Sequence, residues 1–181
     1  MKFQLQYFKE LPSTNTLALE LAGKGAGEGL VIIADHQTNG RGKPGRKWIS
    51  PAGKDLLFSV LLRPRVPPHR APLLTQIACR AVAKVLKGCK ITSTFKRPND
   101  ILVQGKKICG VLVEASSGSK GKLESAVVGI GLNVNASLKE LVPQATSMKE
   151  ITGREYSRQN LLKQILRELR NDLKEFYGYP S

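Results

Sequence analysis

The order of the apolar segments constrains the fold of this chain most strongly. Residues 2–8 alternate apolar and polar side chains, as a half-buried strand does, and residues 30–35 and 56–62 are apolar runs typical of buried strands. Two longer stretches, 73–88 and the segment from about Arg158 onward, repeat apolar residues with the helical period. Strands interrupted by a few helices favour an α+β domain with a mixed sheet over a doubly wound parallel sheet.

Shorter elements complete this prediction. A helix should begin at residues 13–16, STNT, and run to about Leu21, before a stop at Gly23. Further strands are expected at residues 91–95, 101–103, 108–114 and 122–133, with Gly105 in a hairpin turn between the second and third of these. Glycine inside a strand often marks the close approach of a ligand or another backbone, so Gly129 and Gly131 single out the last strand.

The composition indicates one globular domain, residues 1–181, with 41% hydrophobic residues. No apolar run is long enough to span a bilayer, and the first residues lack the apolar segment of a secretory signal. The 3 cysteines have no CxxC spacing, which indicates reduced thiols and no zinc site. The sequence therefore predicts a cytoplasmic protein with no membrane partner.

A strong positive charge points to anionic ligands or partners. The chain carries 29 Lys and Arg against 14 Asp and Glu, a net charge of +15. Such an excess attracts nucleotides, acidic proteins or nucleic acid. The cations are scattered, however, and the sequence contains no RNP motif, zinc finger or basic recognition helix. We therefore expect no specific DNA binding.

The clearest candidate for an anion site is the segment 40–48, GRGKPGRKW, which follows an apolar strand-like run. Its glycines let backbone N–H groups approach an anion, and its Arg and Lys residues supply the charge that phosphoryl groups need. The spacing matches neither a Walker A loop nor a dinucleotide-binding fingerprint. A flexible basic surface loop is the alternative interpretation.

Four further segments carry polar side chains or glycines where a site could form: 13–15 (STN), 96–100 (KRPND), 107–114 (KICGVLVE) and 129–135 (GIGLNVN). Each also has an ordinary structural explanation. The first could cap a helix, the second could be a turn, and the third could be a hairpin strand with an exposed Lys. No Ser–His or Cys–His pair indicates a covalent mechanism.

In this order the five motifs resemble those of the biotin protein ligase family, over almost the whole chain. The resemblance implies a catalytic domain with the fold of the class II aminoacyl-tRNA synthetases. Such a domain would form biotinyl-5′-AMP from biotin and MgATP and release pyrophosphate. It would then pass biotin to one Lys of a biotin carboxyl carrier protein or of a carboxylase biotinyl domain. The resemblance leaves a homodimer open.

The resemblance also implies the residues of the site. Biotin would be bound by Ser13, Thr14, Asn15, Gln37, Gly40, Arg41, Gly42, Lys107, Gly110, Gly129 and Leu132. ATP would be bound by Arg41, Lys43, Arg46, Trp48, Lys96, Asn99, Asp100 and Asn133, with Trp48 against adenine. Lys107, Arg46 and Lys96 would be the catalytic cations. Magnesium would arrive with the ATP phosphates, and Asp100 is its candidate protein ligand.

The sequence departs from the family pattern at two positions within these motifs. Arg97 stands where the family turn has Trp, and Lys43 stands where the family loop has a second Arg. Lys keeps the charge and loses the bidentate fork of Arg, so we expect a weaker grip on the adenylate. The expected single domain also lacks the C-terminal β-barrel common in the family and the helix-turn-helix of its repressors.

Two other functions are alternatives. A lipoate- or octanoate-protein ligase would use a comparable Lys with a longer, less polar pocket. A non-catalytic biotin-binding relative would keep the pocket without the chemistry. The intact GRG loop, PND turn and GVLVE strand favour biotin over lipoate.

Overall fold

The computed structural model describes residues 1–118 and 121–178; residues 119–120 and 179–181, which the expected single domain includes, lie outside the described part. The strands are β1 Gln4–Leu11, β2 Leu30–Gln37, β3 Leu56–Leu62, β4 Thr94–Lys96, β5 Asp100–Val103, β6 Lys106–Ser117 and β7 Leu123–Leu132. The helices are α1 Thr14–Gly23, α2 Ala71–Gly88, α3 Met148–Thr152 and α4 Arg158–Tyr177, with a 3-10 turn at Pro68–Arg70.

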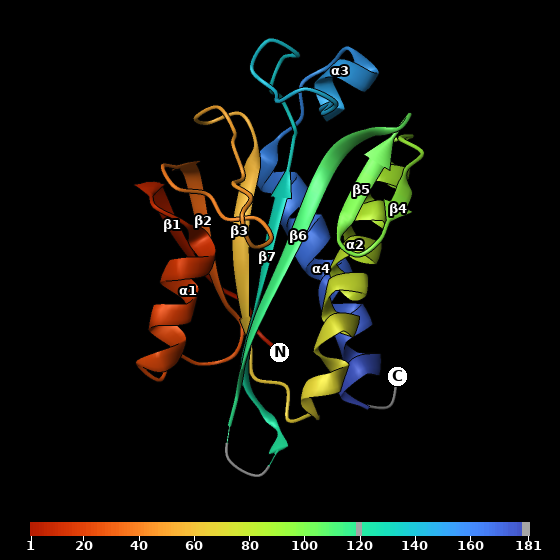
Figure 1. Ribbon diagram of the computed structural model, residues 1–181. Coiled ribbons are helices and arrows are strands. Elements are labelled where there is room, and N and C mark those ends of the chain that lie inside the picture. Colours follow the sequence, from red (N-terminus) through yellow and green to blue (C-terminus); the bar gives the residue numbers. More distant parts are fainter. Residues whose placement is uncertain (119–120, 179–181) are drawn as a thin grey trace.

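The strands form one mixed sheet in the order β1-β2-β3-β7-β6-β5-β4 (Figure 1). β1 pairs with β2 in parallel, and every other pair of neighbours is antiparallel. The α+β class and the mixed sheet predicted from the sequence are confirmed. None of the helices within residues 1–118 and 121–178 is long and apolar enough to cross a bilayer.

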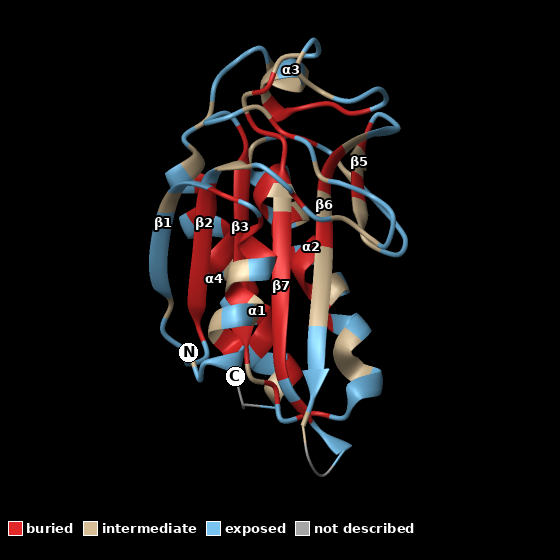
Figure 2. Ribbon diagram, turned by 60° about the vertical axis from the view of Figure 1, so that its left-hand side comes forward, coloured by how far each residue is buried: buried red, intermediate tan, exposed pale blue. Residues whose placement is uncertain are grey.

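The two faces of the sheet bury different residues because side chains alternate along a strand. Val31 and Val60 belong to the main core, which α2 and α4 cover, whereas Ile32 and Leu61 pack under α1 on the other face. Strands β2, β3 and β7 are buried along most of their length, while β1 is largely exposed at the edge (Figure 2). α1 therefore brings its first residues over the middle of the sheet, against β2, β3 and β7.

Local sequence explains most of these elements. Ser13 and Ser157 cap α1 and α4, accepting hydrogen bonds from Thr16 N and Asn160 N. The β5–β6 hairpin turns through Gln104 and Gly105, both with positive φ, as a two-residue turn of type I′ requires. The hairpin predicted at Gly105 is thus confirmed.

Several elements differ from the sequence expectation. The strand expected at 91–95 is instead β4, Thr94–Lys96, because Ile91 N bonds back to Leu86 O at 2.9 Å after the turn at Lys90, so Ile91 packs into the core. The five-residue helix α3 was not expected, since so short a segment shows no helical period. β1 runs to Leu11, and α2 begins at Ala71, slightly beyond the apolar pattern in each case.

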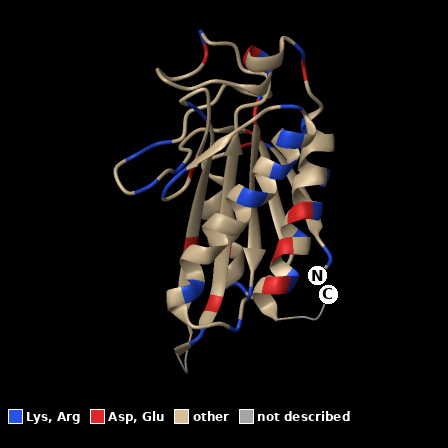
Figure 3. Cartoon of the chain, turned by 90° about the vertical axis from the view of Figure 1, so that its right-hand side faces the viewer, with Lys and Arg blue, Asp and Glu red and all other residues tan. Residues whose placement is uncertain are grey.

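The charges are spread over helices and loops. In the view of Figure 3, Lys and Arg positions occur on the helices and on the projecting loops, with Asp and Glu interspersed on the helices. Within the described part, α2 and α4 pair Arg80 and Lys84 with Asp172 at 3.0 and 2.7 Å. On this side, one carboxylate is therefore shared by two cations.

Candidate active site

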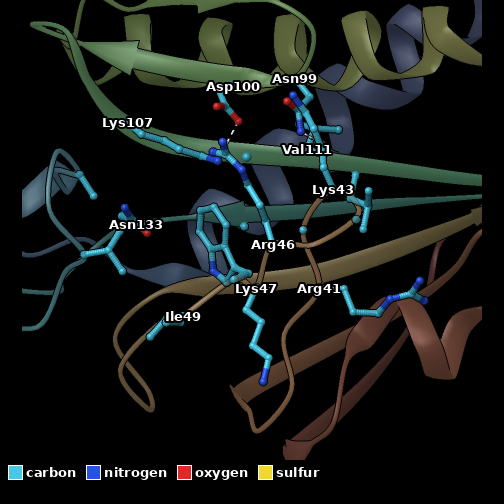
Figure 4. Close-up of a pocket in the computed structure, with 18 of the residues that line it drawn as sticks. Arg41, Lys43, Arg46, Lys47, Ile49, Asn99, Asp100, Lys107, Val111 and Asn133 are labelled. Atoms are coloured by element: carbon cyan, nitrogen blue, oxygen red, sulfur yellow. Dashed lines mark hydrogen bonds and ion pairs between the residues drawn. The ribbon is translucent and has the colours of Figure 1, made fainter.

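One cavity of about 330 Å³ gathers residues from all five motifs. Residues of β6 and β7 form the floor of the cavity. The segment 40–48 forms one wall, and the β4–β5 turn forms another (Figure 4). The predicted residues that line it are Ser13, Thr14, Asn15, Gln37, Arg41, Gly42, Lys43, Arg46, Trp48, Lys96, Asn99, Asp100, Lys107, Gly110, Gly129 and Asn133.

Two predicted residues do not line the cavity. The side chain of Leu132 is buried in the main core on the other face of the sheet, because alternation sends it away from the face of Gly129 and Gly131. Its expected place in the pocket wall is therefore corrected. Gly40 closes the base of the 40–48 segment: Gly40 O accepts from Trp48 N at 2.9 Å, and a Cβ at Gly40 would lie 2.4 Å from Trp48 O.

At one end of the cavity, neutral polar side chains bond to one another. Gln37 Oε1 accepts from Thr14 N at 2.7 Å and from Thr14 Oγ1 at 3.1 Å. Ser59 Oγ lies 2.7 Å from Thr14 Oγ1 and 2.6 Å from Asn15 Oδ1. Sequence reasoning missed Ser59, whose only signal is a single hydroxyl in the apolar run of β3. We call Ser13, Thr14, Asn15, Gln37 and Ser59 the polar end.

Glycines on β6 and β7 make room beside this polar end. A Cβ at Gly129 would lie 2.0 Å from Asn15 Oδ1, and a Cβ at Gly131 would lie 2.5 Å from the Trp48 ring. Gly110 on β6 also faces the Trp48 ring: a Cβ at Gly110 would lie 2.8 Å from a carbon atom of that ring. The sequence predicted the close approach of a ligand or another backbone at Gly129 and Gly131; in the structure the close neighbours are the side chains of Asn15 and Trp48. The predicted contact of Trp48 with adenine stays a prediction.

At the other end of the cavity the side chains are charged. Lys107 Nζ lies 2.7 Å from Asp100 Oδ1 and 5.3 Å from the centroid of the Trp48 ring, within cation–π range. Arg46 reaches from the loop toward Lys107 and Asp100, whereas Arg41 points away (Figure 4). We call Lys43, Arg46, Lys96 and Lys107, with Asp100, the cationic end.

Two buried polar atoms at this end, Asn99 Oδ1 and Trp48 Nε1, have neither a hydrogen-bond nor an ion-pair partner within the described residues, and a third, Asp100 Oδ1, has only its ion pair with Lys107. Asn99 is fixed by its other amide atom, since Nδ2 donates to Val111 O at 2.8 Å. Buried polar groups are normally paired, so these two atoms suit a ligand that supplies an N–H or O–H and an acceptor. No cluster of three or more His, Cys, Asp or Glu side chains within 1–118 and 121–178 could hold a metal ion.

The segment directly after β7, Asn133 and Val134, is held in place by hydrogen bonds next to the cationic end. Asn133 Nδ2 donates to Thr146 O at 2.9 Å, and the next residue, Val134, donates its N–H to Asp55 Oδ1 at 2.9 Å. Burial raises the pKa of Asp55 to about 6, although the backbone N–H groups of Val134 and Ala136 partly oppose that rise. A carboxyl inside the fold therefore holds the chain that presents Asn133.

Residues 141–145 also line the cavity, and sequence reasoning missed them. This segment is held against β6, because Lys107 N donates to Gln144 O and Thr146 N donates to Lys107 O, both at 2.9 Å. Leu141, Val142 and Pro143 give the cavity an apolar flank beside Ile49. Their only sequence signal is that they follow the last motif directly.

The two departures from the family pattern lie in different places. Lys43 lines the cavity, whereas Arg97 lines a separate groove with residues of α2 such as Leu73 and Arg80. Lys96 and Arg97 are therefore adjacent in the sequence but point to different places: Lys96 lines the cavity and Arg97 lines the groove. Arg97 thus lies outside the cavity, and the weaker binding of the adenylate that we expect from Lys43 stays a prediction.

Comparisons with known proteins place the chain among protein ligases. Residues 7–133 match the model of the Biotin/lipoate A/B protein ligase family. The chain is 38% identical over 167 residues to the Bifunctional ligase/repressor BirA of Bacillus subtilis, covering 90% of this chain and 51% of that protein. It is 33% identical over 172 residues to the Biotin--[acetyl-CoA-carboxylase] ligase of Mycobacterium tuberculosis, covering 92% of this chain and 62% of that protein.

The fold is similar to that of a biotin protein ligase from Aquifex aeolicus solved in complex with biotin and ATP, with a TM-score of 0.81 and 35% identity. That match covers 97% of this chain and 72% of the other. The chain spans about half the length of the Bacillus relative. The matched family model includes the polar end, the 40–48 segment and the cationic end up to Asn133. The chain therefore belongs to the biotin/lipoate A/B protein ligase family.

Proposed function

We propose that this chain is an ATP-dependent biotin protein ligase. It forms biotinyl-5′-AMP from biotin and MgATP and then transfers biotin to one Lys of a biotin carboxyl carrier protein or carboxylase biotinyl domain. The observation that carries this proposal is the division of one cavity into a polar end and a cationic end. The names of the matched relatives, and the solved relative with biotin and ATP, support it.

The polar end suits the ureido ring of biotin. A ureido group offers one carbonyl acceptor and two N–H donors, so its site must supply both kinds of partner. Thr14, Asn15 and Gln37 carry hydroxyl and amide groups that are already held in place by hydrogen bonds. The glycines at 110, 129 and 131 let Trp48 and Asn15 lie close to β6 and β7, and the apolar ring and chain of biotin would pack beside these side chains. The biotin carboxylate then lies toward Lys107.

The cationic end suits the first reaction. A carboxylate oxygen of biotin attacks the α-phosphorus of ATP, a C–O–P bond forms, and the bond from that phosphorus to the pyrophosphate oxygen breaks. Two anions must meet, so cations at fixed positions lower the barrier and no protein nucleophile is needed. Lys107 would lie between the carboxylate of biotin and the phosphates of ATP. Arg46 reaches toward Lys107 from the loop (Figure 4). Lys43 and Lys96 hold the leaving phosphates.

The oxygen atoms of Asn99 and Asp100 suit magnesium that arrives with ATP. Mg²⁺ in nucleotide sites is bound through one or two protein oxygens and the phosphates, and it neutralises phosphate charge there. Asn99 Oδ1 has no hydrogen-bond partner among the described residues, and Asp100 lies beside Lys107. Adenine would lie against Trp48 and the apolar flank of residues 141–143.

The second reaction needs access and a good leaving group. The ε-amine of the acceptor Lys attacks the acyl carbon of the adenylate, and AMP leaves with the C–O electrons. Lys107 remains beside the acyl phosphate and stabilises the charge on AMP as it departs. The cavity opens past Ile49 and Val142, both exposed, which leaves an entry for an acceptor side chain.

The polar end argues against lipoate or octanoate as the substrate. A dithiolane ring or an alkyl chain offers no hydrogen bonds to Thr14, Asn15 and Gln37. Burying these groups under an apolar ligand would cost roughly 1–3 kcal/mol for each one left unpaired. A non-catalytic biotin binder would not need three cations at the far end of the cavity, because it binds no phosphates there; these cations are Arg46, Lys96 and Lys107.

The proposal is tested by incubating the chain with MgATP, biotin and a carboxylase biotinyl domain. Mass spectrometry should show one biotinyl group on a single Lys of the acceptor. Parallel reactions with lipoate and octanoate should leave the acceptor unmodified. Transfer of octanoate or lipoate at a rate equal to that of biotin would favour the alternative enzyme. No transfer of any acyl group from a chain that binds biotin would favour the non-catalytic relative.

A further inference from the structure

We propose that Glu114, at the end of the 107–114 motif, is a positioning residue that ties the 40–48 segment to the polar end through Arg41 and Asn15. The inference rests on the proposed function and deepens it. It concerns a residue that neither the motif roles nor the comparisons assign. Glu114 does not line the cavity; it acts through the two residues that do.

The contacts of Glu114 use both of its carboxylate oxygens. Oε1 accepts from Arg41 Nη2 at 2.7 Å, and Oε2 accepts from Asn15 Nδ2 at 2.9 Å. Hydrogen bonds to an ionised carboxylate are short and strong, as these are. One side chain on β6 therefore joins the start of α1 to the glycine-rich segment, which are far apart in the sequence.

The contact with Asn15 fixes which atom of its amide is available to a ligand. Asn15 Nδ2 donates to Glu114 and, at 3.3 Å, to Leu112 O, while Oδ1 accepts from Ser59. Both N–H bonds of the amide are thus occupied by β6. Only the carbonyl oxygen has capacity left, and it matches an N–H of the ureido ring. Without the Glu114 carboxylate, this orientation loses its strongest bond.

The contact with Arg41 holds the 40–48 segment. The backbones of Arg41 and Lys47 form an isolated antiparallel β-bridge, and Gly42 N donates to Arg46 O at 3.0 Å. The segment therefore folds back on itself as a small loop. The Arg41 side chain points away from Lys107 and Asp100 (Figure 4). We therefore assign Arg41 to anchoring this loop beside the polar end. Lys43 and Arg46 of the same loop would bind the phosphates.

Removing the Glu114 charge should release both partners together. In Glu114→Gln the side-chain shape is kept, but one oxygen becomes an NH₂ group. That amide can accept from Arg41 or from Asn15, and not from both. Biotin should then dissociate faster, because the loop is untied and the Asn15 amide can turn. The ATP site should be affected less, since Lys96 and Lys107 lie outside this loop, and Lys43 and Arg46 stay in the turn that Gly42 N closes on Arg46 O.

The test is a double-mutant cycle on the dissociation rate of biotin from the 181-residue chain, measured without ATP using labelled biotin. Glu114→Gln and Arg41→Gln should each raise the rate about tenfold, the scale of a charge-assisted hydrogen bond. The double variant should be no faster than the faster single variant, because both changes remove the same contact. Glu155→Gln, which breaks the exposed ion pair with Lys149, is the matched control and should leave the rate unchanged.

A second readout separates positioning from general damage. KM for biotin should rise in Glu114→Gln by a larger factor than KM for ATP, because the polar end loses the bond that orients Asn15, whereas the cationic end loses only one anchor of its loop. Glu114→Asp, which keeps two acceptor oxygens, and Arg41→Lys, which keeps the charge, should each give intermediate rates. These two variants carry the test if Glu114→Gln does not fold.

The outcomes distinguish this inference from the proposed function. If the parent binds biotin and Glu114→Gln releases it at the parental rate, the positioning role is overturned and the ligase proposal stands. If the two single effects multiply in the double variant, Glu114 and Arg41 act separately and the coupling is overturned. If the parent does not bind biotin at all, both proposals are overturned together.

Discussion

The two ends of the cavity differ in how far they are built before any ligand arrives. At the polar end, Thr14, Asn15 and Ser59 are buried and hydrogen-bonded to one another. At the cationic end, Lys43, Arg46 and Lys96 form no ion pair within the described residues. Burial explains the difference: neutral groups inside the fold must be paired, whereas cations at an open mouth can keep their water.

This difference assigns separate tasks to the two ends. In the proposed enzyme, the preformed polar end would recognise biotin without a nucleotide, because its donors and acceptors are already in place. The cationic end gains its partners only when phosphates arrive. Salt should therefore weaken ATP binding far more than biotin binding, since exposed charges are screened and buried neutral hydrogen bonds are not.

Lys107→Ala should show the largest effect and separate the two ends most clearly. Removing this charge should slow adenylate formation about 100- to 1,000-fold, the scale of a lost group that stabilises developing charge. Biotin binding without ATP should change much less. Pyrophosphate release from biotin and MgATP measures the first quantity, and labelled biotin measures the second.

Lys106→Ala is the matched control for that change, because Lys106 is the neighbouring cation on β6 and does not line the cavity. The control should release pyrophosphate at the parental rate. A Lys107→Ala variant that also did so would show that the cationic end does not depend on this residue.

Asp55→Asn examines the support beneath the cationic end. Burial raises the pKa of Asp55 from 3.8 to about 6, and Glu140 and Arg158 lie near enough to act on it in opposite directions. The folded chain thus holds this proton more tightly than the unfolded chain, so the Asp55 contribution to stability falls as pH rises from about 4 to about 6. Asn does not titrate. Relative to the parent, the variant should gain up to about 3 kcal/mol in unfolding free energy across that range.

Urea unfolding at a series of pH values measures this difference, with the exposed Glu20→Gln variant as control. Equal pH dependence in the parent and in Asp55→Asn would mean that Asp55 ionises in the folded chain as easily as in the unfolded one. The support of Asn133 would then need another explanation.

Gly129→Ala should damage the polar end alone. Its methyl group would meet Asn15 Oδ1, an atom that Ser59 and Glu114 hold in place through the Asn15 amide. Overpacking of this kind costs about 2 kcal/mol, so biotin affinity should fall about thirtyfold. Titration calorimetry with biotin and, separately, with ATP should show the loss for biotin only. Gly23→Ala, where a Cβ meets nothing within 4 Å, is the control.

Lys43→Arg should give the smallest effect and act at the cationic end. An Arg can donate two parallel hydrogen bonds to a phosphate, whereas Lys acts as a point charge. Release of preformed biotinyl-5′-AMP should therefore slow by about tenfold, equivalent to about 1.5 kcal/mol. If the Arg variant releases the adenylate as fast as the parent, residue 43 does not set its retention.

The fold was predictable where a periodic pattern runs long enough. The apolar stripes of α2 and α4 and the runs of β2 and β3 each gave the right element type. The patterns were too short at β4 and α3, where the packing of Ile91 and the Ser147 cap decide the structure. The period of two would itself have placed Leu132 opposite Gly131, and so outside the cavity.

Most of the cavity lining was predictable because it falls in five motifs, whereas its supporting residues were not. Ser59, Glu114 and the 141–145 segment matter through contacts with residues distant in the sequence. Asn15, for example, meets Glu114 across 99 positions. No local pattern encodes such a contact. A lone polar residue within or directly after an apolar run, as at Ser59 and Glu114, is the nearest signal that the sequence offers.

The central claim is that biotin, held at the polar end, presents its carboxylate to ATP at the cationic end. Pyrophosphate release from MgATP tests this most directly, measured with biotin, with no biotin, and with biotinol, in which an alcohol replaces the carboxylate. We predict release, with biotinyl-5′-AMP as the other product, only with biotin, although biotinol should still bind. Release without biotin or with biotinol, or no release from a chain that has bound both biotin and MgATP, would contradict the claim.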